Sequence, residues 1–397
     1  MTILSYTLIY YEVMLVNNHF QQLPTLLIGR GIVGKIGEHI PSPETNTILI
    51  IVDDNLRNHS IVKKIKSFLP AQVNNIQVWQ VTHVKNNLKK GQKLPIEKGQ
   101  SQYDTIIGVG ENDLLNYVRL FAEASEKNKQ SDKQEQAKHN LKLILIPTIV
   151  SSGLEVTKQT YTYIDEIQKR SLAPSTITTT IIYDPLLSLN AAPYEITSNS
   201  LMTLAEAIET YFFAPKHRTL SLISIKLLSH HIVRATYHND DIEAYEALLK
   251  SSMLLGLSGE PDAQISLFNC FTIPIIKQVD ISYPIALATM LPYIIDLYRQ
   301  KDEAGGVKIV KELGVTFSKV DDYYYYFIAR LTNLTKTLGY PNHLSSLGIK
   351  RDDLLGLTSH AYTLWSMNSP SMVTWSEKDF FHIYEKAFAE KNETPFT

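Results

Sequence analysis

The periodicity of apolar residues changes once along this 397-residue chain, close to Asp184-Pro185. Before that point, short apolar runs alternate with amphipathic or polar segments, which is typical of a mostly parallel sheet covered by helices on both faces. After it, apolar residues recur at helical spacing almost throughout. The sequence therefore predicts an α/β N-terminal domain over residues 1–185, with a Rossmann-like sheet, and an all-helical C-terminal domain over 186–397.

The apolar runs of the first half are the expected strands, because each is rich in β-branched residues and bounded by turn formers. They are ILIIV (48–52), IQVWQV (76–81), DTIIGVG (104–110), LKLILIP (141–147) and TTIIYD (179–184). Helices are expected over 57–69 and 112–124, whereas the polar segments 83–102 and 124–140 predict solvated loops. Helices of the second half are expected over 200–213, 217–237 and 241–257.

Composition and charge exclude several kinds of protein. The formal net charge of −2 gives no general reason to expect nucleic acid or an anionic membrane surface as a partner. No apolar run reaches the roughly 18 residues that a membrane span requires. The single cysteine, Cys270, fits a reducing cytoplasm. Segment 1–16 lacks the basic residues and the cleavage site of a signal peptide, so we expect a cytoplasmic protein that starts at Met1 or Met14.

Motifs in both halves resemble those of the iron-containing (group III) alcohol dehydrogenases. PTLLIGRGIVGKIGEHI (24–40) is similar to the opening P-x-x-I-x-F-G-x-G-x-x-x-x-L of that family, and IPTIVSSGLEVT (146–157) to I-P-T-T-x-G-T-G-S-E-V-T. Segments 347–370 and 377–388 are similar to its closing helices. The resemblance covers nearly the whole chain. It implies the dehydroquinate synthase-like fold of this family, NAD(P)-dependent alcohol oxidation at a divalent metal and, by analogy, a homodimer.

The metal-binding positions of the family carry other residues in this chain. The family holds its metal with an Asp and three His, and the resemblance places these positions at Met202, Glu206, Ile273 and Tyr283. The helix motif D-A-L-T-H-A-I-E-A-Y reads MTLAEAIETY here, and another family His is replaced by Asn269. A thioether is a poor ligand for a hard divalent ion. Since a site generally needs at least three protein ligands, we expect neither iron nor zinc.

The nucleotide-binding loop of the family is altered as well. Its G-G-G-S reads Gly110-Glu111-Asn112-Asp113 here, so glycines that permit close backbone approach are lost. Glu111 and Asp113 also bring negative charge to the place of a diphosphate, although Asp113 is also a candidate N-cap of the next helix. NAD binding is therefore expected to be weakened. The residues that would meet this cofactor are Asp53, Gly110, Thr148, Ser151 and Ser152.

Other residues with potential chemistry have simpler explanations. His230, His231 and His238 lie on one expected helix at spacings that do not converge on one ion, so we expect structural histidines. Cys270 is expected to be a small core residue. The four tyrosines at 323–326 would cover a helix on all sides, which predicts packing in the core or at an oligomer contact.

These observations favour a pseudoenzyme, a family member that has lost metal-dependent hydride transfer and acts as a binding, scaffolding or regulatory subunit. The alternative is a repurposed, metal-independent enzyme that uses the interdomain cleft, in which Glu206 and Tyr283 form an acid–base pair and Ser151 and Ser152 orient the substrate or a nucleotide. A third hypothesis is an NAD(P)-dependent alcohol dehydrogenase with metal ligands recruited from elsewhere.

The residues that replaced the metal ligands are expected to fill the space between them, because an empty polar hole would be destabilising. Met202, Ile273 and Tyr283 should lie close together and be mostly buried. Glu206 should lie within hydrogen-bonding reach of Tyr283, or of a water molecule between them.

Overall fold

The structure is a computed structural model. It describes residues 24–41, 46–53, 56–73, 75–82, 84, 88, 103–131, 141–157, 159–164, 167–172, 177–189, 191–214, 218–259, 266–316, 323–368 and 375–388. The alternative starts at Met1 and Met14 lie outside these residues, as do nearly all of the predicted loop over 83–102 and the end of the one over 124–140.

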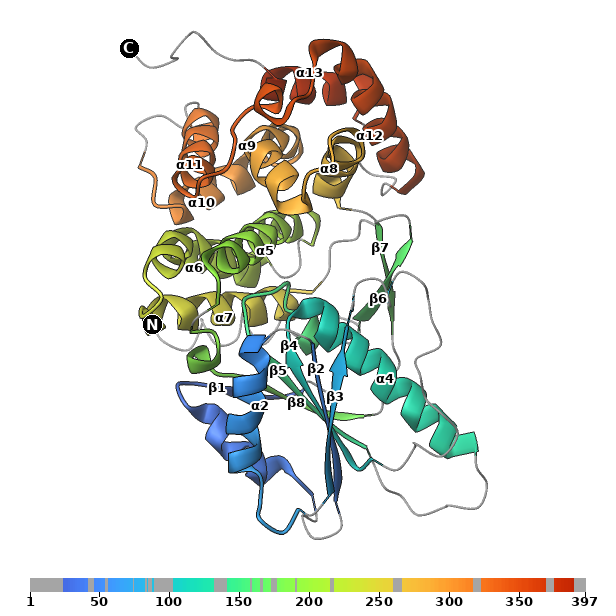
Figure 1. The fold of residues 1–397 in the computed structure, drawn as a ribbon. Coiled ribbons are helices and arrows are strands. Elements are labelled where there is room, and N and C mark those ends of the chain that lie inside the picture. The colour runs from blue at the N-terminus through green and yellow to red at the C-terminus, as the bar shows by residue number, and fades with distance from the viewer. Residues whose placement is uncertain are drawn as a thin grey trace, which may run out of the picture.

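The sheet half, residues 24–183, is built on parallel strands. Within the described residues, six strands form one sheet in the order β1-β8-β5-β4-β2-β3, and every neighbouring pair is parallel. Their bounds are β1 Thr25–Ile28, β2 Thr47–Asp53, β3 Asn75–Val81, β4 Thr105–Gly110, β5 Lys142–Pro147 and β8 Thr178–Tyr183. The predicted parallel sheet is confirmed, and Figure 1 shows it below the helices of the second half.

Helices cover both faces of this sheet. Because side chains alternate along a strand, Ile48 and Ile50 of β2 join one core with α2 (Leu56–Phe68) and η1 (Ile32–His39). Leu49 and Ile51 join the opposite core with α4 (Asn112–Ser131). The predicted loop over 124–140 is therefore wrong at its start. Residues 124–131 continue the helix, since Ala, Glu, Lys and Gln have high helix propensity without needing an apolar face.

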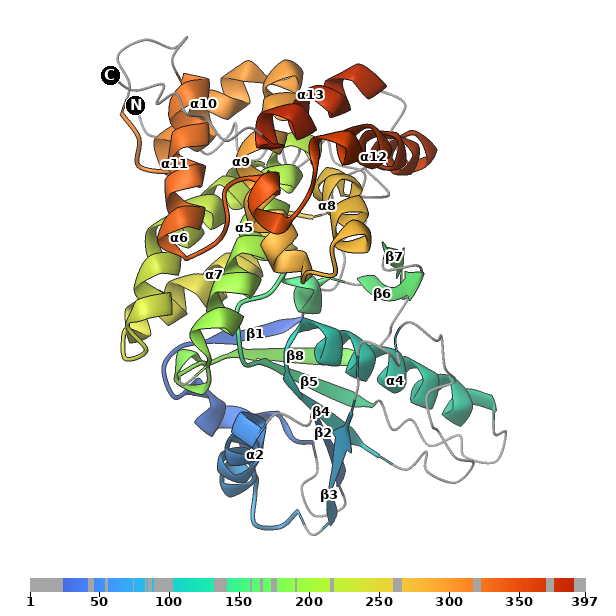
Figure 2. The same ribbon diagram turned by 45° about the horizontal axis from the view of Figure 1, so that its top comes forward.

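An antiparallel hairpin interrupts the parallel pattern. It consists of β6 (Gln159–Ile164) and β7 (Ile167–Leu172) and was not predicted from the sequence. Asn116 of α4 bonds to the backbone of β6 in both directions. Its side-chain NH2 group donates to the carbonyl of Tyr161 at 2.8 Å, and its side-chain oxygen accepts from the Tyr161 N–H at 2.9 Å. In both views the hairpin lies between α4 and α8 (Figures 1 and 2).

The second half of the chain, from Pro193 onward, is mostly helical, as predicted, and is called the helical half below. Its α-helices are α5 Pro193–Phe213, α6 Arg218–Tyr237, α7 Ile242–Leu257, α8 Leu267–Gln278, α9 Tyr283–Lys301, α10 Glu303–Glu312, α11 Tyr323–Thr337, α12 Leu354–Asn368 and α13 Glu377–Phe388. On α11, Tyr323 is buried whereas Tyr325 and Tyr326 are exposed. None of the described helices is both long and apolar enough to cross a membrane.

Helix α7 packs against both halves of the molecule. Leu249, Met253 and Leu257 recur at intervals of four residues, so they share one helix face, and that face joins the sheet-half core beside α4. Tyr245 and Leu248 belong instead to the core of the helical half. Helix α7 therefore connects the two cores, and Figures 1 and 2 show it next to the sheet.

Candidate functional site

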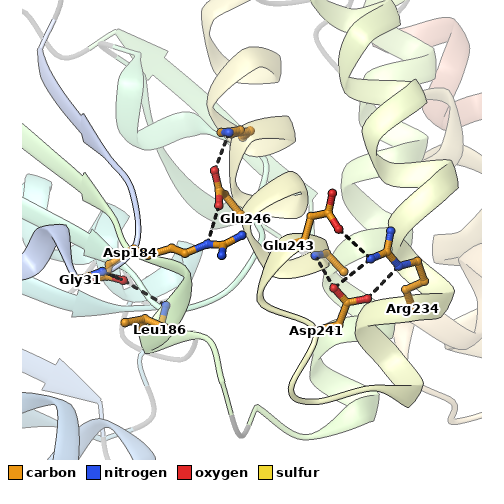
Figure 3. Close-up of polar contacts among 10 residues, drawn as sticks. Gly31, Asp184, Leu186, Arg234, Asp241, Glu243 and Glu246 are labelled. Atoms are coloured by element: carbon orange, nitrogen blue, oxygen red, sulfur yellow. Dashed lines mark hydrogen bonds and ion pairs between the residues drawn. The ribbon is translucent and has the colours of Figure 1, made fainter.

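The turn after β1 is held by one buried carboxylate. Asp184 accepts hydrogen bonds from the backbone N–H groups of Gly31 (3.0 Å), Val33 (3.1 Å) and Leu186 (3.0 Å). Gly31 has φ of 71°, a left-handed conformation that glycine adopts readily. Figure 3 shows Asp184 between Gly31 and Leu186. Asp184 thus fixes the loop at the carboxyl edge of the sheet, next to η1.

Two of the predicted cofactor residues meet at this edge. Asp53 ends β2 and Gly110 ends β4, and a Cβ atom on Gly110 would lie 3.4 Å from Asp53 Oδ2. The prediction of Asp113 as an N-cap is wrong. Helix α4 already begins at Asn112, and the Asp113 carboxylate accepts a hydrogen bond from the Tyr161 hydroxyl at 2.5 Å. That carboxylate is therefore used to position the β6 strand.

Hydrogen bonds join the loop after β5 to the end of β4 and to α7. The N–H of Thr148, a buried residue, donates to the carbonyl of Gly110 at 3.0 Å. The N–H of Ser151 donates to Ser252 Oγ at 2.7 Å, and the same hydroxyl donates back to the Ser151 carbonyl at 2.7 Å. Ser151 is therefore a buried anchor to α7. Ser152 stays partly exposed, with its Oγ 3.4 Å from Asn112 Oδ1.

Two glycines, Gly153 of the loop after β5 and Gly256 of α7, allow the loop and the helix to lie very close together. A Cβ atom on Gly153 would lie 1.9 Å from the carbonyl oxygen of Ser252, and one on Gly256 would lie 2.0 Å from the carbonyl oxygen of Gly153. Gly153 also has φ of 74°. The ion pair of Arg30 with Glu246, at 3.1 Å, joins the sheet half to α7 at a second place (Figure 3).

The same loop contains a buried carboxylate that sequence reasoning missed, Glu155. Glu155 accepts hydrogen bonds from the Tyr183 hydroxyl at 2.7 Å and from Ser151 Oγ at 3.3 Å. Burial raises the pKa of Glu155, and it also raises the pKa of Tyr183. Arg119 fixes the same loop by donating to the carbonyls of Leu154 and Thr157. The polar residues of this motif therefore hold the loop in place.

The four positions that the sequence resemblance assigns to the family metal site lie on α5, α8 and α9. Met202 and Glu206 are partly exposed on α5, Ile273 is 2% exposed on α8, and Tyr283 is the first residue of α9. Met202 and Tyr283 both pack against the core of the helical half. The Tyr283 hydroxyl donates to Asn269 Oδ1 at 2.6 Å. That Glu206 lies within hydrogen-bonding distance of Tyr283, or of a water molecule between them, stays a prediction.

The residues at these positions do not fit a divalent metal ion. Ile273 has no donor atom, and Met202 offers only a thioether. Burial raises the pKa of Tyr283, and the negative charges of Glu209 and Glu206 raise it further, so the phenol is a poor source of a phenolate ligand. Throughout the described part of the chain, no group of three or more His, Cys, Asp or Glu residues could hold a metal.

Glu209 is the second buried carboxylate that the sequence did not single out. It lies one turn after Glu206 on α5 and is 2% exposed. Its Oε1 accepts hydrogen bonds from the N–H of Leu267 at 2.6 Å and from the Tyr298 hydroxyl at 3.1 Å. Burial raises its pKa to about 7. Its position within MTLAEAIETY, where the family motif also has a Glu, was the available signal.

Comparison with known proteins finds the same family in both halves of the chain. The family model of iron-containing alcohol dehydrogenase matches residues 24–185, and that of the C-terminal part of the Fe-containing alcohol dehydrogenase family matches 198–388. Long-chain-alcohol dehydrogenase 1 of Geobacillus thermodenitrificans (strain NG80-2) is 24% identical over 378 residues, which are 92% of this chain and 95% of that protein.

Solved structures show the same fold at low sequence identity. A 1,3-propanediol oxidoreductase superposes with a TM-score of 0.74 at 18% identity, covering 92% of this chain and 98% of that one. An alcohol dehydrogenase from Oenococcus oeni gives a TM-score of 0.72 at 18% identity, covering 92% and 99%.

A Rossmann-like parallel sheet whose carboxyl edge meets a helical half is the architecture that this chain shares with these solved structures. The two family models together span most of the chain. This chain belongs to the iron-containing alcohol dehydrogenase family.

Proposed function

We propose that this chain is a pseudoenzyme of its family, one that has lost metal-dependent hydride transfer and serves as a binding, scaffolding or regulatory subunit. It would act in the cytoplasm, as a homodimer or with a protein partner. The observation that carries the proposal is the residue set at the metal positions, where Ile273 and Met202 replace ligands and Tyr283 bonds to Asn269. Without a Lewis acid to polarise the alcohol oxygen, the family reaction loses several kcal/mol of transition-state stabilisation.

The two alternatives have less support. An acid–base pair of Glu206 and Tyr283 would need one group that accepts a proton near neutral pH. The raised pKa of Tyr283 leaves Glu206 as the base and Tyr283 as the acid, but the Tyr283 hydroxyl donates its hydrogen bond to Asn269 Oδ1 at 2.6 Å. A relocated metal site would need a new cluster of ligands, and the described residues offer none.

Metal content tests this proposal directly. Protein purified from medium supplemented with iron or zinc is expected to contain far less than one metal ion per chain after dialysis, measured by inductively coupled plasma mass spectrometry. The matched control restores the family ligands in one variant, Met202→Asp, Glu206→His, Ile273→His and Tyr283→His, and is expected to gain metal. Near-stoichiometric metal in the unmodified protein would refute the pseudoenzyme proposal.

We propose further that any remaining dinucleotide binding favours NAD over NADP. Asp53 stands at the carboxyl end of β2 beside Gly110, where a carboxylate accepts from a ribose 2′-OH and repels a 2′-phosphate. NADP(H) should bind at least about tenfold more weakly than NAD(H), equivalent to ~1.4 kcal/mol, in calorimetric titration. Asp53→Asn should reduce this preference. Tighter binding of NADP(H) by the unmodified protein would contradict the role of Asp53.

A further inference from the structure

Helix α12 (Leu354–Asn368) exposes two large apolar side chains to water. Leu355 is 71% exposed and Met367 is 76% exposed, the two highest values among the large apolar residues that the structure describes as exposed. The opposite side of the helix is buried in the core of the helical half by Leu354, Leu357, Ala361 and Trp365. Figures 1 and 2 show α12 at the outside of the helical half, next to α8 and α13. The exposed side of α12 is therefore an apolar part of the protein surface.

The same side of α12 lacks charge. The helix has no Lys, Arg, Asp or Glu within its bounds, unlike every other α-helix named above. A helix at the surface ordinarily carries charged residues on the side that faces water. Besides Leu355 and Met367, the exposed residues of this side are small, namely Gly356, Ser359, Thr363 and Ser366. These six residues are called the α12 face below.

Gly356 is an independent indication that another molecule covers this face. Glycine within a helix lowers its stability, because its backbone loses more freedom on folding than that of other residues. Gly356 has no positive φ, and a Cβ atom there would meet nothing within 4 Å among the described residues. Packing within the chain therefore does not require a glycine. Close approach of a second molecule does, since glycine leaves room for it.

The α12 face is complementary to itself. On a helix with 3.6 residues per turn, one edge of this face holds Leu355 and Ser366, the other edge holds Gly356 and Met367, and the middle holds Ser359 and Thr363. A two-fold axis that makes two such helices antiparallel brings together the opposite ends of the same edge. Leu355 then faces Ser366 of the second copy, and Met367 faces Gly356 of the second copy. Each large apolar side chain thus meets a small residue.

We propose that the α12 face binds the α12 face of a second copy of this chain, with the two helices antiparallel about a two-fold axis. In such a contact the same patch is used by both copies, so any charge on it would be brought close to an identical charge. The α12 face has no charge to repel its own copy. The inference deepens the homodimer of the proposed function and rests on that part of it alone. Metal content and association therefore test the two proposals separately.

The size of the contact determines its expected strength. One helix from each copy buries less than the roughly 1,200 Å² of surface that stable complexes bury. Association should therefore be weak and depend on concentration, with a Kd in the micromolar range. Sedimentation velocity of the unmodified protein between about 1 and 200 μM should show the mass doubling as concentration rises.

Lysine substitutions test whether the α12 face makes the contact. Leu355→Lys and Met367→Lys should each raise the Kd at least about tenfold, because each places one charge from both copies in the contact. Both side chains are mostly exposed, so the fold should be kept. Ile223→Lys is the matched control, since Ile223 is an apolar residue that is 40% exposed on α6. It should leave the Kd unchanged.

Gly356→Leu separates the contact from the stability of α12. Leucine has a higher helix propensity than glycine, and the space around Gly356 is open, so the Tm of the variant should not fall. The added side chain would occupy the place of Met367 of the second copy, so the Kd should rise at least about tenfold. Association that is unchanged in this variant and in both lysine variants would overturn the proposal.

Disulfide formation tests the antiparallel arrangement. Cys270 is the single cysteine of the chain and is 0% exposed, so an introduced surface cysteine is the reactive one. An equal mixture of Ser359→Cys and Thr363→Cys should form the mixed disulfide faster than either variant alone forms a disulfide with itself. Faster pairing of like variants, or no association of the unmodified protein in the sedimentation experiment, would also overturn the proposal.

Discussion

Substitution of Gly153 by alanine is expected to lower the free energy of unfolding by roughly 3–5 kcal/mol. The added Cβ atom would lie 1.9 Å from the Ser252 carbonyl oxygen and 2.7 Å from the Gly256 nitrogen, both of which are backbone atoms of α7. Such atoms cannot rotate away, so the loop and the helix would have to separate. The left-handed φ of 74° adds to the cost. Urea denaturation followed by circular dichroism measures the loss.

Gly339→Ala is the matched control for this substitution. Gly339 has a similar φ of 83°, but a Cβ atom there would have nothing within 4 Å. It should lose only the cost of the left-handed conformation, about 1–2 kcal/mol. If both variants lose the same free energy, the close packing of the loop on α7 is not a source of stability.

Asp184→Ala is expected to cost roughly 3–6 kcal/mol, or to prevent folding. Asp184 is 0% exposed, and the N–H groups of Gly31, Val33 and Leu186 donate to its carboxylate. Each buried donor left without an acceptor costs about 1–3 kcal/mol. Thermal unfolding by calorimetry, together with the soluble yield of the variant, checks this prediction.

The control for Asp184 is a partly exposed carboxylate, that of Asp241 at the start of α7. Asp241 accepts from the N–H of Ala244 at 3.0 Å and from Arg234 at 2.8 Å, and Arg234 also pairs with Glu243 (Figure 3). Water can replace these partners, so Asp241→Ala should cost about 1 kcal/mol. A loss for Asp184→Ala as small as this would show that water reaches the Gly31 turn.

The parallel sheet and the helical half could be predicted because local pattern determines them. Strands such as Thr47–Asp53 are buried on both faces, so their sequences are continuously apolar. In the same way, the helical spacing of apolar residues predicted the helices of the second half. The resemblance around Met202 and Glu206 was also visible in the sequence, since MTLAEAIETY keeps the length of the family motif D-A-L-T-H-A-I-E-A-Y while two of its donor residues differ.

What the sequence did not reveal depends on partners distant along the chain. Glu209 reads as one more acidic residue of an amphipathic helix, and its role comes from Leu267 and Tyr298, which pack against it from other helices. Asp113 looked like a helix cap because its actual partner, Tyr161, lies in a hairpin with no strong turn signal. Long-range hydrogen bonds of this kind have no sequence period that could predict them.

The place of α7 between the two cores has a consequence for synthesis on the ribosome. Strand β8 ends at Tyr183, whereas the residues that complete the core beside α4 are Leu249, Met253 and Leu257. The nascent sheet therefore emerges with an apolar surface that stays open to water until α7 has left the exit tunnel. A chain that stalls between these points would present that surface to chaperones and to other nascent chains.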